Sequence, residues 1–435
     1  MTRATRFLAC LAALAPLVAG AQYRRIPLPM DPALARWIGA NARSLPSVDA
    51  PYADSTWAWL DAFVGNARVL AIGENIHGGH EPLALRNHLI RYAVTHLGFT
   101  AIAIESPLSE GEVVERFIQG EGDVSAIDSV VRAGIYPPFA PFPETRELVQ
   151  WMREFNATSA RKVHFYGVDH TGAGADDMGG PLAIERALAW LASVDAAGAT
   201  RRRAALEPFL GRFTVAGYQG LTRPERSRLH AALLALEAAV RSAGRPVAGA
   251  KADREAAFAL RHAWAARRLE DAFAMAGDAG VRALPVIRFR DSVMTENAHW
   301  ALEQQGPGGR AIVFAHNGHV LDVPMAFPSI GRPMRMMGQR MRARYGNAMR
   351  SIGTAADDFT GLGTVLHDAS AWETMLTGVR GGTWRLDLRS ASPQVAAVLD
   401  QPWVTRIHAW LQPFEPRRAM DLVVVFDTVH ATRLR

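Results

Sequence analysis

Cysteine and lysine are the residue types that this sequence has least of. Its 435 residues include a single cysteine, Cys10, and two lysines, Lys162 and Lys251, so arginine carries almost all of the positive charge. Cys10 lies in an N-terminal segment that we predict to be removed. The mature protein then has no cysteine, which excludes disulfides, thiolate catalysis and cysteine metal sites.

The chain also lacks a basic block interleaved with aromatic residues, although its net charge is +6. Such a block is the usual mark of a nucleic-acid interface. We therefore expect no nucleic-acid partner.

Several catalytic and cofactor motifs are missing. The sequence has no G-x-S-x-G elbow, no H-E-x-x-H, no Walker loop and no strand-linked G-x-G-x-x-G. A standard serine esterase and a nucleotide cofactor are thus disfavoured. With neither a serine elbow nor a mature cysteine, water is the most natural nucleophile, and we expect no cofactor.

The N-terminus has the features of a secretory signal peptide. Arg3 and Arg6 precede an apolar run over residues 7–18, and residues 19–21 read Ala-Gly-Ala before Gln22. The run is too short to span a bilayer as one helix. We predict a signal peptide over residues 1–21 and a periplasmic or secreted protein without stable membrane insertion.

From about Trp57 the sequence alternates short apolar runs with stretches of helical spacing. This pattern is typical of βαβ units, and it predicts an α/β fold with a mainly parallel sheet flanked by helices. The expected strands cover residues 68–73, 100–105, 162–168, 310–315, 383–388 and 421–426.

Between about residues 181 and 275 the sequence becomes rich in Ala, Leu and Arg at helical spacing. We interpret this stretch as a helical insertion that packs over the sheet, within one α/β domain covering residues 22–435. A separate helical domain is the alternative that the sequence leaves open.

Ionisable side chains crowd the turn after the first expected strand. Glu74, His77, His80 and Glu81 follow the apolar run within a few residues. In the next helix, Arg86 shares the apolar stripe and is expected to be buried. Because an unpaired buried charge is costly, we expect Arg86 to pair with Glu74 or Glu105.

Three further expected strands end in the same way. Glu105 ends one of them, Asp169 and His170 end another, and His316 and His319 follow a third. Ligands of open α/β sheets bind at the carboxyl ends of the strands. Any one of these residues alone is more simply a structural group, but together they favour a functional site.

These residues match a known family. The motif over residues 73–86, Gly-Glu-x-x-His-Gly with the later Glu81 and Leu85-Arg86, resembles the opening motif of the erythromycin esterase family. Further similar segments lie at residues 165–169, 290–297, 315–319, 337–353 and 426–432, so the resemblance covers about residues 57–435.

The resemblance implies metal-independent hydrolysis of an ester, which for some members is a macrolide lactone in antibiotic resistance. It implies that His77 is the general base and that Glu74 and Glu105 orient it or the water. Arg86 would be the essential arginine and His316 the second histidine. The remaining polar groups at this edge we assign to substrate binding: His319, Asp169, His80 and Asn317.

Two features separate this chain from many relatives. Residues 136–143 are proline-rich where many relatives carry tryptophans. This chain also carries an export signal, whereas many resistance esterases are cytosolic. The substrate class expected is therefore a small-molecule ester or lactone, without commitment to a macrolide.

Two other functions remain open. A metal-dependent hydrolase could use Glu74, His77, His80 and His316 as zinc or manganese ligands. A periplasmic protein that binds iron, haem or another small ligand is suggested only by analogy of fold. A methionine cluster offers ligands for soft metals, but packing is the simpler interpretation: Met334, Met336, Met337 and Met341.

Overall fold

The structure is a computed structural model that describes residues 30–137, 139–172, 179–243, 250–277, 284–324, 334–362, 368–407 and 410–433. The signal peptide predicted over residues 1–21 lies outside these ranges. In the part of the chain that is described, no helix is both long and apolar enough to cross a bilayer.

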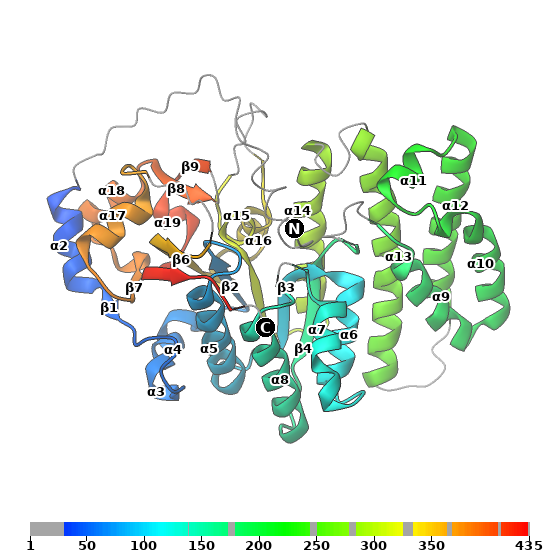
Figure 1. The fold of residues 1–435 in the computed structure, drawn as a ribbon, viewed down its shortest axis with the longest axis horizontal. Helices are drawn as coiled ribbons and strands as arrows, with labels where there is room; N and C mark the ends of the chain where they lie inside the picture. The colour runs from blue at the N-terminus through cyan, green and yellow to red at the C-terminus, as the bar shows by residue number, and fades with distance from the viewer. Residues whose placement is uncertain are drawn as a thin grey trace.

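An eight-stranded sheet runs through the centre of the molecule in the order β1-β7-β10-β6-β2-β5-β3-β4 (Figure 1). All neighbours from β10 to β4 are parallel, whereas β7 pairs antiparallel with β10 and with β1. The predicted α/β fold with a mainly parallel sheet is thus confirmed. The strands are β1 (Arg43–Ser44), β2 (Val69–Glu74), β3 (Ala101–Pro107), β4 (His164–Asp169), β5 (Ala311–His316), β6 (Met349–Thr360), β7 (Trp384–Asp387) and β10 (Leu422–His430).

Six of these strands coincide with expected ones, but the long strand β6 was not predicted. Its inward-facing positions carry small and polar residues, such as Ser351, Gly353 and Thr354, in place of a bulky apolar run. Gly353 is required by packing, since a Cβ there would lie 2.6 Å from the sulfur of Met420. The pattern rule for buried strands therefore missed β6.

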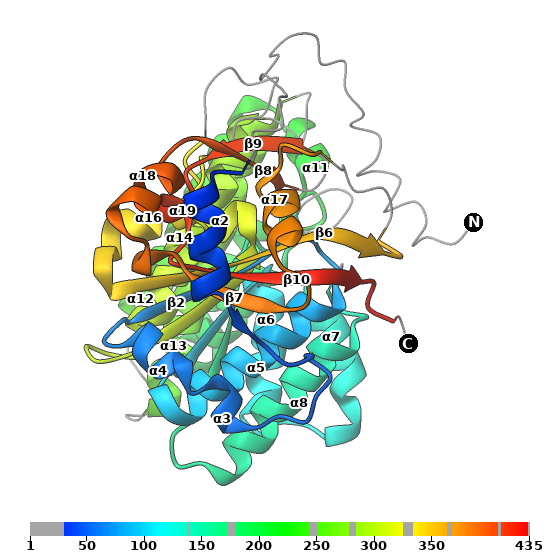
Figure 2. The same cartoon turned by 90° about the vertical axis from the view of Figure 1, so that its left-hand side faces the viewer.

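Helices cover both faces of the sheet, as the side view in Figure 2 shows. Each face has its own hydrophobic core, built from alternate residues of the strands. One layer holds α3 (Asp54–Trp57), α4 (Trp59–Val64), α5 (His80–Leu97), α6 (Leu108–Ile118), α7 (Ile127–Gly134) and α8 (Pro143–Thr158). The other holds α2 (Pro32–Asn41), α14 (Leu284–Glu303), α16 (Met337–Tyr345), α17 (Trp372–Val379) and α18 (Pro393–Leu399).

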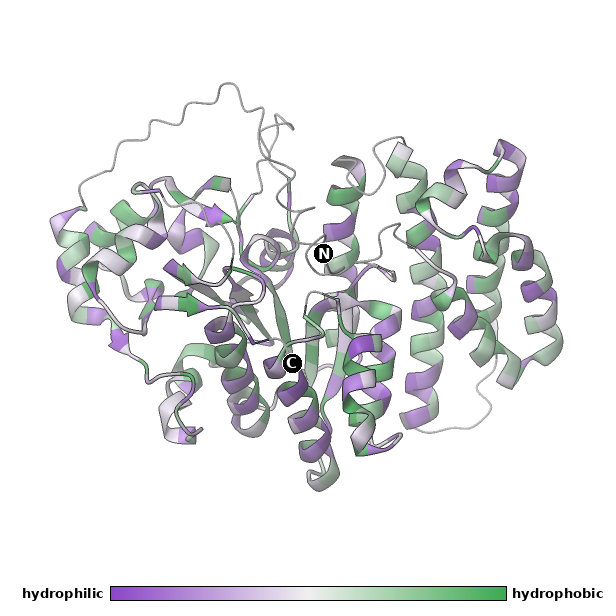
Figure 3. Ribbon diagram, in the orientation of Figure 1, coloured by the Kyte–Doolittle hydropathy of each residue, from purple (hydrophilic) through white to green (hydrophobic). Residues whose placement is uncertain are grey.

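Short elements complete the fold. They are α15 (Asn317–Val320), α19 (Pro416–Ala419) and a separate antiparallel pair, β8 (Trp403–Ile407) with β9 (Trp410–Phe414). In Figure 3 the hydrophobic colour gathers on the central strands, while the outer helices mix both colours, as expected for a layered α/β core.

The stretch from about residue 181 to 275 is helical, as expected. It forms α9 (Leu182–Val194), α10 (Ala196–Leu210), α11 (Val215–Gln219), α12 (Arg223–Ser242) and α13 (Ala250–Ala276). Its interpretation as an insertion within one domain stays a prediction. The helices extend past edge strand β4 (Figure 1) and build a third core with residues of α6 and α14. They also meet β4 itself, where the ring of Phe258 on α13 stacks on Tyr166 at 5.8 Å.

The methionine cluster is a packing feature, as the simpler interpretation held. Met334, Met336, Met337 and Met341 are all buried, and Met337 and Met341 belong to the core beneath α14 and α16.

Candidate active site

The first element of the site is a histidine held by a buried carboxylate. Glu74 is the last residue of β2 and is fully buried, and its Oε1 forms a hydrogen bond with Nδ1 of His77. The turn between them and α5 needs Gly78, whose φ of 80° favours glycine. The side chain of His77 is 22% exposed. The pair therefore combines a buried carboxyl group with an imidazole ring that solvent can reach.

The charges of this pair depend on each other. Burial disfavours the imidazolium form of His77, but the charge and hydrogen bond of Glu74 outweigh burial and raise the His77 pKa. The Glu74 carboxylate also fixes the ring orientation. The proton therefore sits on Nδ1, and Nε2 is the nitrogen that can take a further proton.

The second histidine faces the first from the neighbouring strand. His316 ends β5 opposite Glu74 in the parallel register, and the His77 and His316 ring centroids are 5.0 Å apart. Nε2 of His316 lies 3.2 Å from the carbonyl oxygen of Asn75, and Nδ1 accepts the N–H of Gly318 at 3.1 Å. Both nitrogens are used, so His316 is suited to positioning His77 more than to donating a proton.

Glu105 connects the end of β3 to the same edge. Its Oε2 accepts the backbone N–H of His316 at 2.9 Å, and its Oε1 lies 2.9 Å from Nη2 of Arg290 on α14. Although burial opposes ionisation, His319 and Arg290 hold the pKa of Glu105 well below its usual range. Glu105 is therefore a permanent anion beside the histidines.

One arginine joins the ends of β3 and β4. Arg290 binds Asp169 through Nε at 2.9 Å and through Nη2 at 2.6 Å, while Nη2 also reaches Glu105. Two carboxylates outweigh the effect of burial and raise the Arg290 pKa further. Arg290 keeps 28% of its side chain exposed, so the cation remains open toward the edge of the sheet.

His319 adds a further imidazole beside Glu105. Its Nδ1 lies 3.0 Å from Oδ1 of the fully buried Asp291, and its Nε2 lies 3.5 Å from Oε1 of Glu105. Burial opposes protonation, but Asp291 and Glu105 outweigh it and raise the His319 pKa. Nη1 of Arg290 lies 3.3 Å from the same Nε2, so Arg290 and His319 meet next to Glu105.

Arg86 is buried as predicted, but its expected ion pair with Glu74 or Glu105 was wrong. Its guanidinium lies over the ring of Phe314 at 4.8 Å and bonds to the side chain of Asn87 and to a carbonyl oxygen. Arg290 of α14 forms the ion pair with Glu105 instead. Burial lowers the Arg86 pKa to about 10.

His80 begins α5 and lies in a different group. Its Nδ1 is 2.5 Å from Oε1 of Glu144, and its Nε2 is 2.9 Å from Oδ1 of Asp49. The hydrogen bond to Glu144 raises the His80 pKa to about 9. His80 therefore links α5 to α8, and its assignment to substrate binding stays a prediction.

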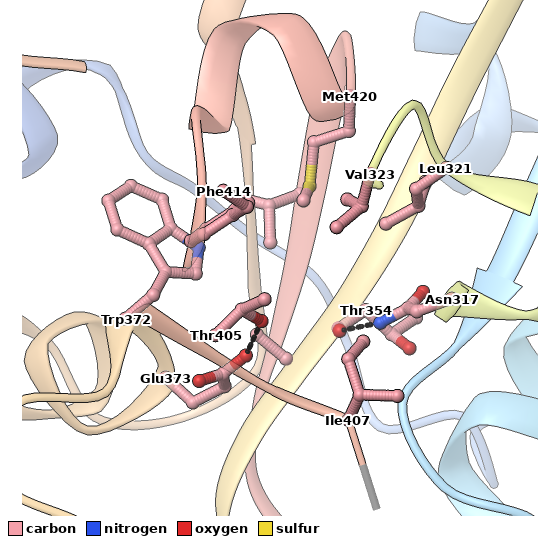
Figure 4. A pocket seen from close by; sticks show the side chains of 12 residues that line it. Asn317, Leu321, Val323, Thr354, Trp372, Glu373, Thr405, Ile407, Phe414 and Met420 are labelled. Atoms are coloured by element: carbon pink, nitrogen blue, oxygen red, sulfur yellow. Dashed lines mark hydrogen bonds between the residues drawn. The ribbon is translucent and has the colours of Figure 1, made fainter. Parts of the chain in front are cut away.

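Asn317 faces the interior of the sheet layer. Its amide donates to the carbonyl oxygen of Thr354 at 2.8 Å. This hydrogen bond lies on one side of a cavity of about 10 Å³, and the hydrogen bond between Glu373 and Thr405 lies on the other (Figure 4). A cavity of this size holds about one water molecule. Asn317 thus ties β5 to β6, and its assignment to substrate binding also stays a prediction.

Arg290 and Asp291 are the site residues that reasoning from the sequence did not assign. They lie in the segment 290–297 that resembles the family. A helical pattern does not show, however, that the guanidinium of Arg290 binds carboxylates on two strands.

Among the residues that the structure describes, no group of three or more His, Asp or Glu side chains is arranged to hold a metal ion.

Comparison with known proteins identifies relatives along most of the chain. The profile described as erythromycin esterase matches residues 94–429. Erythromycin esterase type II from Escherichia coli is 34% identical over 110 residues, which are 25% of this chain and 25% of that protein. The aligned part thus spans about a quarter of the curated relative.

Solved structures share the fold. A Bacillus cereus protein (20% identity) and a succinoglycan biosynthesis protein (18%) each have a TM-score of 0.77, with 93% of this chain and 98% of theirs covered. The erythromycin esterase EreC, solved as a histidine-to-asparagine mutant in its open conformation, has a TM-score of 0.64 at 16% identity, with 90% and 99% covered. These identities speak for the fold alone, but the profile match over most of the length shows that this chain belongs to the erythromycin esterase family.

Proposed function

We propose that this protein is an exported hydrolase that cleaves an ester or lactone with water activated by His77. The observation that carries the proposal is the His77–Glu74 pair, in which a buried carboxylate holds a partly exposed imidazole 5.0 Å from the ring of His316. A base oriented in this way is the usual means of activating water without a covalent intermediate.

The reaction follows from these positions. Nε2 of His77 takes a proton from water as the oxygen attacks the carbonyl carbon, and the carbonyl oxygen becomes an oxyanion. Collapse of this intermediate breaks the bond to the leaving oxygen, and the His77 imidazolium returns its proton to that oxygen. One water is consumed, and an acid and an alcohol are formed.

The oxyanion needs positive charge or hydrogen-bond donors nearby. We assign this role to Arg290, whose guanidinium stays positive and whose side chain is 28% exposed; the side chain of His319 beside it is 16% exposed. His316 is less suited, because both of its ring nitrogens already have partners. Glu105 would hold Arg290, His319 and the His316 backbone in place.

Substrate class and location extend this proposal. Family membership and the erythromycin esterases among the relatives support an ester or lactone, and a macrolide is one candidate. The signal-like segment over residues 1–21 supports export to the periplasm or beyond.

The test is a screen of esters and lactones, macrolides included, with the purified full-length protein and its His77→Ala variant. We expect hydrolysis of at least one class by the wild type and none by the variant. A protein that binds such compounds without turning any over would instead support the small-ligand binding alternative.

A further inference from the structure

The turn that follows α7 is held against the end of β3. Oγ of Ser106 accepts the backbone N–H of Tyr136 at 2.7 Å and donates to the carbonyl oxygen of Gly134 at 3.3 Å. Ser106 is fully buried and comes directly after Glu105 in β3. The backbone of Tyr136 is therefore fixed at the same strand end as the Glu105 carboxylate.

The ring of Tyr136 belongs to a row of rings that ends at the catalytic base. The ring centroids of Tyr136 and Phe139 are 5.8 Å apart, and those of Phe139 and His77 are 5.0 Å apart. Phe139 is only 1% exposed, so the middle ring of the row is packed into the core. One aromatic ring thus separates Tyr136 from His77.

The hydroxyl of Tyr136 lies in the field of the charged groups at this edge. Burial raises the Tyr136 pKa, Arg290 opposes this effect, and Asp169 and Glu105 add to it. The tyrosine in turn acts on the pKa of Arg290. A phenol with a raised pKa keeps its proton at neutral pH, so the hydroxyl is a hydrogen-bond donor there.

This hydroxyl is open to a ligand. Among the residues that the structure describes, none forms a hydrogen bond with it, and the oxygen is not buried in the partly exposed side chain. A tyrosine hydroxyl inside a protein usually has a partner. Four other tyrosine hydroxyls follow this rule: those of Tyr92, Tyr166, Tyr218 and Tyr345.

We infer that Tyr136 is a further catalytic residue of the proposed hydrolase, and that its hydroxyl donates a hydrogen bond to the substrate carbonyl oxygen as this becomes an oxyanion. The inference rests on the proposed function. The guanidinium of Arg290 is shared with two carboxylates, so a neutral donor beside it adds stabilisation of the oxyanion. The phenol keeps its proton throughout, and His77 carries out the proton transfers.

Tyr136→Phe tests this inference, because it removes the hydroxyl and keeps the ring that packs on Phe139. On a substrate found by the screen, we expect kcat to fall by about 100-fold, as for loss of one oxyanion donor. KM should stay within about two-fold of wild type, since the hydrogen bond forms fully only in the transition state. The pH midpoint of kcat/KM should not move, because His77 is unchanged.

A phosphonate analogue of the same substrate gives a readout that a merely structural role would not move. Its charged tetrahedral oxygens resemble the oxyanion intermediate. In Tyr136→Phe we expect the inhibition constant of the analogue to rise by about the factor by which kcat/KM falls. An unchanged inhibition constant would overturn the inference.

The matched control is Tyr218→Phe, at a hydroxyl that binds Glu270 at 3.0 Å within the helical stretch 181–275. We expect its kcat to equal that of wild type. Wild-type kcat in Tyr136→Phe, with His77→Ala inactive, would overturn the inference and leave the hydrolase function standing. Loss of kcat in Tyr136→Phe with full activity in His77→Ala would support the role of Tyr136 and contradict the assigned base.

Discussion

Oε2 of Glu105 accepts the backbone N–H of His316 at 2.9 Å, so a side chain from β3 holds the last residue of β5. The other oxygen of Glu105 binds Arg290. One carboxylate therefore sets the position of a histidine ring and of a cation at the same edge of the sheet.

The first prediction concerns this carboxylate. Glu105→Gln keeps the shape but removes the charge opposite Arg290 and His319, so we expect the free energy of unfolding to fall by about 1–3 kcal/mol. Turnover should fall as well, because Arg290 and His319 lose the carboxylate that holds them. Urea unfolding measures the first effect. The matched control is Glu303→Gln, at a side chain that is 59% exposed. Its free energy of unfolding should stay within about 0.5 kcal/mol of the wild-type value. Equal effects of the two substitutions would count against the role of Glu105.

The second prediction is a pH dependence. His77 must be neutral to accept a proton, so kcat/KM should rise as pH increases through the His77 pKa. Because Glu74 raises that pKa despite burial, the midpoint of the rise should lie above the usual value of 6.5. In Glu74→Gln the remaining turnover should show a midpoint at lower pH, and a midpoint that does not move would show that another group titrates.

The third prediction concerns Gly73, which precedes Glu74. A Cβ at this position would lie 2.2 Å from Oδ1 of Asn317 and 3.1 Å from Cγ1 of Val320. Gly73→Ala should therefore lower the free energy of unfolding by about 1–3 kcal/mol and displace Glu74. Gly39→Ala, in α2 with no atom within 4 Å of the new Cβ, should instead raise stability by about 0.5–1 kcal/mol. Thermal unfolding distinguishes the two signs.

The fourth prediction concerns metal removal. The base, its orienting carboxylate and the groups assigned to the oxyanion are all side chains of this protein, so turnover should be unchanged after dialysis against EDTA. Elemental analysis of the dialysed sample confirms removal. Activity that disappears with chelation and returns with zinc or manganese would favour the metal-dependent alternative.

The sequence predicted which residues lie at this edge of the sheet better than which of them bind one another. Glu74, Asp169 and His316 each end a strand, and Glu105 lies two residues before the end of β3. Strand ends can be read from apolar runs, so the meeting of these residues at one edge follows from parallel pairing. The partner of Glu105 could not be read in this way. Arg290 lies on a helix 185 residues later, and its reach depends on how α14 packs over β4.

Helical periodicity has a similar limit. It showed that Arg86 faces the core, but a periodic pattern gives only the face of a helix and not the neighbouring atoms. The guanidinium meets Phe314 and a carbonyl oxygen there, not a carboxylate. The central strand β6 was missed for a related reason. A buried strand is expected to be an apolar run, whereas β6 carries small and polar residues.

The most direct measurement is kcat/KM of His77→Ala relative to wild type on a substrate identified by the screen, with folding checked by circular dichroism. His96→Ala, at a histidine that is 37% exposed on α5 and pairs with Asp54, is the control for loss of an imidazole. We predict that turnover falls to background in His77→Ala and is unchanged in His96→Ala. Wild-type turnover by a folded His77→Ala protein would contradict the assignment of the base and, with it, the proposed mechanism.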